Sequence, residues 1–169
     1  MSRALLALGS NVPPRLTFLR RAIAKIREIG EIQHIAALYE SEPFGVRQQP
    51  GFLNFAIEID TQLSPEDLLK AVKSIEQKTG RKQRFRWGPR EIDIDIIFYG
   101  QQLVNLPDLQ IPHPDYRQRR FVLQPLCDIA ADVVAPDARQ TLHQLLENCP
   151  DTALLRHLQT NWTTNGTEL

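Results

Sequence analysis

Two aspartates interrupt an apolar run in the segment REIDIDIIFYG, where Asp93 and Asp95 alternate with Ile92, Ile94 and Ile96. Side chains alternate between the two faces of a strand, so the isoleucines face one way and the aspartates the other. Two carboxylates about 6.6 Å apart repel each other in a partly dry cleft, and a shared cation relieves that repulsion. Oxygen ligands of this kind suit Mg²⁺, which completes its shell with water and substrate phosphates. From the spacing alone, a strand with a solvated acidic face explains the pattern equally well.

A basic segment lies directly upstream of these aspartates. From Gln77 to Arg90 it contains six basic residues and no acid, whereas the whole chain has 20 Lys and Arg against 20 Asp and Glu. A local concentration of positive charge in a neutral protein favours a small, highly charged partner over a nucleic-acid surface. Gly80, Gly88 and Pro89 predict a loop. Polyphosphate with Mg²⁺ would satisfy both the basic segment and the aspartates, and an ordinary solvated loop is the alternative. The basic residues are Lys78, Arg81, Lys82, Arg84, Arg86 and Arg90.

Length and composition predict one globular domain that needs no disulfide. The chain has 169 residues, of which 42% are hydrophobic and 24% charged, and no apolar run approaches the ~20 residues of a membrane span. The apolar stretch at the N-terminus is too short for a signal peptide, so we expect a cytoplasmic protein. Cys127 and Cys149 fit reduced, packed thiols without a function. We expect the domain to cover residues 1–160 and residues 161–169 to form a disordered tail.

The hydrophobic periodicity predicts an α+β fold. The order of elements is βαββαβ, the ferredoxin-like arrangement of an antiparallel sheet with helices on one face, followed by extra C-terminal helices. In the third strand, four residues are expected to face the core and four to face outward. Core-facing are Leu53, Phe55, Ile57 and Ile59, and outward-facing are Phe52, Asn54, Ala56 and Glu58. The predicted strands are 3–11, 31–40, 52–60 and the one through Asp95; the predicted helices are 13–26, 64–80, 123–130 and 138–149.

Four motifs occur in order along the chain: LGSN, FLN, RWGPREIDIDI and IPHPDYRQRRFVLQPL. Together they closely resemble the 6-hydroxymethyl-7,8-dihydropterin pyrophosphokinase family over roughly residues 3 to 150, and RWGPR followed by the D-x-D strand is the most specific of them. The resemblance implies an enzyme of folate biosynthesis that transfers the β,γ-pyrophosphoryl group of ATP to the hydroxymethyl group of the pterin and releases AMP. It also implies two Mg²⁺ ions, the small-molecule substrates ATP and pterin, no nucleic-acid or membrane partner, and a monomer.

The same resemblance implies roles for individual residues. The catalytic residues would be Arg81, Arg90, Asp93 and Asp95, of which the two aspartates bind the metal. ATP would be bound by Glu76, Arg81, Arg90, His113 and Arg119, and the pterin by Ser41, Phe44, Phe52, Asn54 and Phe121. The chain departs from the family pattern at Glu42, Phe52, Lys73 and Gln83. His113, between two prolines, could instead shape a turn, and phenylalanines such as Phe52 and Phe121 more often belong to a core.

Two other classes of function remain open at this stage. The first is a non-catalytic nucleotide-binding module, since this fold by itself specifies no chemistry; the presence of both aspartates argues against it. The second is a nucleic-acid-binding domain, which only the basic loop supports and which a steep salt dependence of binding would reveal.

Overall fold

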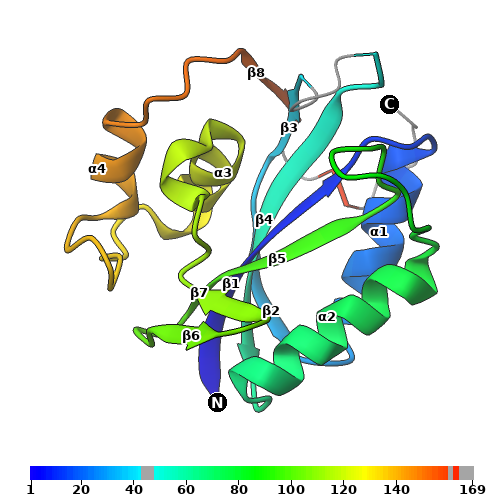
Figure 1. The fold of residues 1–169 in the computed structure, drawn as a ribbon. Helices are drawn as coiled ribbons and strands as arrows, with labels where there is room; N and C mark the ends of the chain where they lie inside the picture. Colours follow the sequence, from blue (N-terminus) through cyan, green and yellow to red (C-terminus); the bar gives the residue numbers. More distant parts are fainter. Residues whose placement is uncertain (43–47, 160–161, 164–169) are drawn as a thin grey trace.

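A computed structural model describes residues 1–42, 48–159 and 162–163. Its centre is an antiparallel sheet in which the neighbouring strands are β5-β1-β4-β3-β8, with β2 also paired to β4 (Figure 1). The α+β class and the βαββαβ order of the core are therefore confirmed. The strands are β1 (Ser2–Ser10), β2 (Glu31–Ile35), β3 (Leu38–Ser41), β4 (Phe52–Thr61), β5 (Asp93–Tyr99) and β8 (Leu155–Gln159).

Two amphipathic helices cover one face of the sheet, α1 (Arg15–Ile26) and α2 (Pro65–Thr79). The start of α2 follows from local chemistry, because the Ser64 side chain accepts a hydrogen bond from the Asp67 amide and Pro65 occupies the first helical position. Its end is at Gly80, whose φ of 120° favours glycine. The core between these helices and the sheet contains the predicted apolar stripes, including the four core-facing residues of β4, Ile92 directly before β5, and Ile94 and Ile96 within β5.

The strand predicted over residues 31–40 is divided into two. β2 pairs with the C-terminal half of β4, and β3 pairs with its N-terminal half. Between them, Ala36 donates its amide to the Ala56 carbonyl, and its own carbonyl accepts a hydrogen bond from Trp162 Nε1 at 3.1 Å. The interruption lets two short strands follow the full length of β4. It is held by Trp162, which is 126 positions away from Ala36 in the sequence.

The C-terminal helices cover the second face of the sheet (Figure 1). They are α3 (Arg120–Ala130), which begins three residues earlier than predicted, and α4 (Leu142–Glu147), which is shorter than predicted. Ala56 lies in a second apolar core beneath α3 and is fully buried, and Glu58 is 7% exposed. The prediction that these two residues face outward is therefore wrong, because the second face is covered as well.

The sequence reasoning also missed a small hairpin, β6 (Val104–Leu106) and β7 (Leu109–Ile111), the short 3-10 helix η1 (Tyr116–Gln118), and strand β8. Trp162 falls within the range expected to be a disordered tail, yet its ring is fully buried. Most of that range lies outside the described residues, so the boundary of the domain stays a prediction. Within the described part of the chain, no helix is both long and apolar enough to cross a membrane.

Candidate active site

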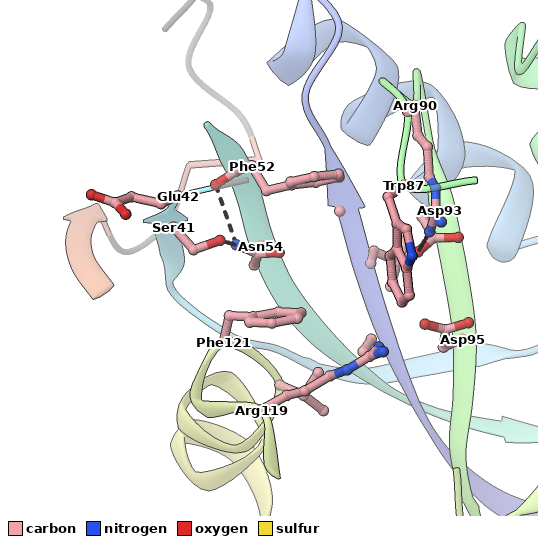
Figure 2. Close-up of a pocket in the computed structure, with 15 residues that line it drawn as sticks. Ser41, Glu42, Phe52, Asn54, Trp87, Arg90, Asp93, Asp95, Arg119 and Phe121 are labelled. Atoms are coloured by element: carbon pink, nitrogen blue, oxygen red, sulfur yellow. Dashed lines mark hydrogen bonds and ion pairs between the residues drawn. The ribbon is translucent and has the colours of Figure 1, made fainter. Parts of the chain in front are cut away.

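A pocket opens where β1, β4 and β5 lie side by side, between the first turn of α3 and the loop over residues 81–92 (Figure 2). Most of the residues predicted to form a site are brought together around it. The predicted residues that line it are Ser41, Phe52, Asn54, Arg90, Asp93, Asp95, Arg119 and Phe121. Phe44 lies outside the described residues.

The floor of the pocket is made of two rows of paired residues. Gly9 of β1 pairs with Asp93 on one side and with Asn54 on the other. In the next row, Ala7 pairs with Asp95 and with Ala56. A Cβ atom on Gly9 would lie 3.2 Å from Asn54 Oδ1, so a larger residue would press against the amide. Small side chains on β1 thus leave the space between the aspartates and the asparagine open.

Asp93 is held by two arginines of the flanking loop. Arg81 Nη1 donates to its Oδ1 at 3.1 Å, and Arg90 Nη1 donates to its Oδ2 at 2.9 Å. The two guanidinium groups reach one carboxylate from opposite ends of the loop. They are the kind of planar donors that recognise phosphate oxygens.

Asp95 lies on the same face of β5, two residues further along the strand. Burial and the charge of Asp93 raise the pKa of Asp95 to about 7. Two acidic groups in one partly dry site therefore repel each other strongly enough that a cation would stabilise the ionised pair. Among the described residues, no group of three or more His, Cys, Asp or Glu side chains is arranged to hold a metal. A metal here would need further ligands from substrate or water.

His113 faces Asp95 from the segment that follows β7, with 4.0 Å between Nε2 and Asp95 Oδ2. Its Nδ1 accepts a hydrogen bond from the Asp115 amide at 3.2 Å, so the neutral ring carries its proton on Nε2. Burial and the nearby Arg119 charge lower the pKa of His113, which keeps the ring neutral at physiological pH. The ring can therefore donate one hydrogen bond into the site.

Glu76 lies behind the pocket and is 2% exposed. Its carboxylate accepts hydrogen bonds from Arg81 Nη1 at 2.6 Å, from the Ile94 amide at 2.8 Å and from Lys73 Nζ at 3.2 Å. These contacts fix the Arg81 guanidinium between α2 and β5. In this structure Glu76 is positioned to orient Arg81, and Lys73 contributes to the same cluster.

Among the described residues that line the opposite end of the pocket, the only acidic or basic ones are Glu42 and Arg119. Figure 2 shows the Phe52 and Phe121 rings on either side of the opening in front of Asn54. The Asn54 amide donates through Nδ2 to Ser41 Oγ at 2.7 Å and to the Phe52 carbonyl at 3.2 Å. Both contacts fix the plane of the amide. Arg119 extends from the start of α3 across the lower side of the pocket toward Asp95.

Three residues around the pocket were missed at the sequence level. Trp87 lines it from the loop, with a φ of 64° that is uncommon for a bulky residue. Asn11, fully buried, accepts from the Arg90 amide at 2.7 Å and donates to Gln49 Oε1 at 2.9 Å. Gln49 Nε2 in turn donates to the Trp87 carbonyl at 3.0 Å. The LGSN motif contained the signal for Asn11, because a polar residue directly after a buried strand must find partners.

Comparison with known proteins places this chain in a family. The model of the 7,8-dihydro-6-hydroxymethylpterin-pyrophosphokinase family matches residues 5–131. The chain belongs to this family. It is 42% identical over 144 residues to the 2-amino-4-hydroxy-6-hydroxymethyldihydropteridine pyrophosphokinase of Aquifex aeolicus, covering 85% of this chain and 90% of that protein. The corresponding Pseudomonas aeruginosa protein is 41% identical over 152 residues, covering 89% and 93%.

A solved structure supports the fold. The wild-type HPPK-DHPS of Plasmodium falciparum with STZ-DHP matches with a TM-score of 0.73 at 16% identity. The match covers 87% of this chain but only 43% of that longer chain, so it is evidence for the fold alone.

Membership of the pyrophosphokinase family settles the activity: the chain transfers a pyrophosphoryl group from ATP to 6-hydroxymethyl-7,8-dihydropterin in folate biosynthesis.

Proposed function

We propose that the pocket divides this reaction between two subsites that share the floor of β1. The pterin would lie between Phe52 and Phe121, in front of Asn54, and the phosphates of ATP would lie over Asp93 and Asp95. The observation that carries the proposal is the pairing of Gly9 with both Asn54 and Asp93: these two residues lie on the strands on either side of β1, with no side chain between them. The hydroxymethyl group of the pterin would then be next to the phosphate chain.

The pterin subsite has the chemistry for a flat, polar heterocycle. Two aromatic rings can stack on the faces of such a ring, and an amide can pair with its edge. Because Ser41 Oγ and the Phe52 carbonyl take the Asn54 Nδ2 hydrogens, the acceptor Oδ1 is the part of the amide offered to a ring N–H. Ser41 thus acts on the pterin through Asn54.

Asp93 and Asp95 are the residues that would hold Mg²⁺, and two ions are expected. The carboxylate pair fits the metal because both groups lie on one face of β5, where burial and the charge of Asp93 raise the pKa of Asp95 to about 7, and a divalent cation would neutralise both groups. When bound, Mg²⁺ would neutralise phosphate charge and orient the phosphate oxygens. Phosphate oxygens and water would complete its coordination.

Arg81 and Arg90 would contact the transferred pyrophosphoryl group. They approach Asp93 from the two ends of one loop, so a bound phosphate could take the place of the carboxylate as their partner. In the reaction, the oxygen of the pterin hydroxymethyl group forms a bond to the β-phosphorus, and the bond from that phosphorus to the oxygen bridging to the α-phosphate breaks. AMP leaves with that oxygen, and the proton of the pterin hydroxyl group is released. Trp87 and Gly88 cover this side of the pocket and would exclude water.

The nucleoside end of ATP would extend past His113 toward the β6–β7 hairpin. A groove beside His113 runs over this hairpin and includes Asn105, Gln110 and Arg117. Arg119, which extends toward Asp95 in Figure 2, would contact the phosphates. This direction leaves the Phe52–Phe121 end of the pocket for the pterin.

Product analysis tests the reaction, and separate titrations of pterin and of Mg-ATP test the division of the pocket into two subsites. The protein is incubated with ATP, the hydroxymethyl dihydropterin and Mg²⁺, and AMP, ADP and the pterin diphosphate are quantified. We expect AMP and pterin diphosphate in equal amounts, and none after chelation of Mg²⁺. Formation of ADP, or product formation that is unaffected by chelation, would contradict the proposed arrangement. The expected monomer and the expected cytoplasmic location stay predictions; light scattering in solution tests the first.

A further inference from the structure

The C-terminal end of the described chain lies along the edge of the sheet next to the pterin subsite. Strand β8 pairs with β3, with Leu155 opposite Ser41 and Arg156 opposite Glu40. We call β8 together with Trp162 the C-terminal strap. It lies beyond residues 5–131, the part of the chain that the family model matches.

Trp162 anchors the strap in the main core. Its ring is fully buried and meets the Phe55 ring edge to face, with 4.6 Å between the ring centroids. Its carbonyl accepts a hydrogen bond from Arg20 Nη2 at 2.8 Å, and its Nε1 donates to the Ala36 carbonyl at 3.1 Å. The strap is therefore held to α1, to β4 and to the interruption between β2 and β3.

An ion cluster connects the strap to both ends of the segment over residues 42–50. The Glu40 carboxylate accepts hydrogen bonds from Arg156 Nη2 and, at 2.6 Å, from Arg15 Nη1. Arg15 Nη1 also donates to the Gly51 carbonyl at 2.8 Å. Ser41 and Gly51 flank this segment and lie against each other. A Cβ atom on Gly51 would be only 2.8 Å from the Ser41 carbonyl oxygen.

The same strand leads directly to the pterin subsite. Ser41 follows Glu40 in β3, and its hydroxyl accepts the hydrogen bond from Asn54 Nδ2 at 2.7 Å. A shift of β3 at Glu40 would therefore move the group that fixes the Asn54 amide. Since β8 is the neighbour of β3 on the side away from β4, the strap limits such a shift.

We propose that the C-terminal strap is a positioning element for the pterin subsite, acting through Arg156, Glu40 and Arg15 on Ser41 and Asn54. The proposal rests on the proposed function, because it needs the pterin to bind at Asn54. None of the three charged residues lines the pocket, so their effect on pterin binding is indirect. The competing explanation is that the cluster only stabilises the sheet.

The chain contains a matched control for that explanation. Glu58, on β4, is paired with Arg3 at 2.8 Å, as Glu40 is paired with Arg15 and Arg156, and it also lies within 3.3 Å of His34 Nδ1. Arg3 lies toward the opposite end of β1 from Gly9, and Glu58 pairs with Leu5. Glu40→Gln and Glu58→Gln therefore remove comparable ion clusters near the pterin subsite and away from it.

The test measures the thermal midpoint and the separate dissociation constants for pterin and Mg-ATP in Glu40→Gln, Glu58→Gln, Arg156→Ala, Arg156→Lys and Arg3→Ala. Because Arg156 is exposed, we expect Arg156→Ala to weaken pterin binding about fivefold, and Glu40→Gln, which also unpairs Arg15, about tenfold or more. Mg-ATP affinity should stay within about twofold. Arg156→Lys should retain pterin affinity, and both control variants should lower the thermal midpoint without changing pterin binding.

Unchanged pterin binding in Glu40→Gln would overturn the proposal, and so would an equal loss of pterin and Mg-ATP affinity. An equal loss of pterin affinity in Glu58→Gln would show that sheet stability alone is responsible and would also overturn it. A wild-type protein that fails to bind pterin would overturn the proposed function and this inference together. If the wild type binds pterin normally, unchanged pterin binding in Glu40→Gln overturns this inference alone and not the proposed function.

Discussion

The two walls of the pocket are held in place by different forces. On the proposed pterin side, Phe52 and Asn54 belong to β4, which is paired with strands on both sides. On the proposed phosphate side, Arg81 and Arg90 belong to a loop, and ion pairs with Asp93 and Glu76 hold them. A neutral ring is recognised by shape and by a few hydrogen bonds, which a backbone ladder can fix in advance. Phosphates are recognised by charge, so the loop can exchange its internal ion pairs for contacts with the ligand.

This difference predicts which kind of change each wall tolerates. Substitutions on the loop should affect catalysis through charge and should be sensitive to pH and salt. Substitutions on the strand wall should affect pterin affinity through geometry. The following experiments test this division, beginning with the largest expected effect.

Asp95→Asn should reduce turnover by about a thousandfold while preserving the fold. The reason is that neutralisation of phosphate charge by metal contributes several kcal/mol, and each tenfold in rate corresponds to about 1.36 kcal/mol. The thermal midpoint should stay the same or rise, because the substitution removes the repulsion between Asp95 and Asp93. Pterin affinity should change little. Steady-state AMP formation, thermal unfolding and pterin titration measure the three properties, and the exposed Asp132→Asn serves as the control. Normal turnover in Asp95→Asn would remove this residue from the metal site.

Arg81→Ala should slow the chemical step by about a hundredfold, since it removes one charged donor from the developing phosphate charge. Ground-state ATP affinity should fall much less, because the contact is completed as the transition state is approached. Single-turnover kinetics combined with equilibrium ATP titration separates these quantities. A loss confined to ATP affinity would show that Arg81 is a binding residue and that the loop wall does not act in catalysis.

Asn54→Ala should weaken pterin binding by about 1–3 kcal/mol, the cost of leaving polar groups of the ring unpaired in a closed pocket. Mg-ATP binding should be unchanged, because Asn54 is separated from Asp93 by the β1 strand. Isothermal titration of each ligand alone measures both affinities. Equal losses for the two ligands would mean that the walls are not independent.

Glu91→Gln tests the loop wall through stability and should have the smallest effect. Glu91 is 3% exposed and accepts hydrogen bonds from Arg84. Burial acts to raise the pKa of Glu91, but the hydrogen bonds from Arg84 and from the backbone amides of Glu91 and Lys82, together with the Arg84 charge, outweigh burial and lower it. A lowered pKa contributes stability above the ordinary glutamate pKa of about 4.3, and this contribution is lost as the pH falls through the folded value.

We therefore expect Glu91→Gln to lower the thermal midpoint at pH 7 by about 2–4 °C and to bring it closer to the wild-type value at acidic pH. Thermal unfolding between pH 7 and pH 3 measures the difference. A difference that is constant over this range would show that the effect does not come from the carboxylate charge.

Local patterns were sufficient for much of the fold and for one half of the site. The alternation of isoleucine with aspartate predicted both faces of β5, and the Ser64 cap with Gly80 predicted both ends of α2. These features depend on residues close together in the sequence. The interruption at Ala36 and the burial of Ala56 could not be predicted in this way, because they depend on Trp162 and α3, which are distant in the sequence.

The same reasoning explains which site residues were missed. Asn11 and Gln49 make contacts with the 81–92 loop over separations of 79 and 38 residues, respectively, and no local periodicity marks such pairs. Trp87 belongs to the basic segment over residues 77–90, whose charge predicted phosphate binding and gave no role to an aromatic ring. In the structure Trp87 lines the pocket. The roles of the individual site residues came from the family resemblance and stay predictions.

The positions of the two tryptophans make the protein suitable for optical measurement. The chain has only Trp87 and Trp162, and the first lines the pocket while the second is fully buried against Phe55. Trp87 emission should respond to bound ligand and to added quenchers, whereas Trp162 emission should be blue-shifted and protected from them. A single unmodified sample can therefore report occupancy of the pocket and integrity of the core as two separate fluorescence signals.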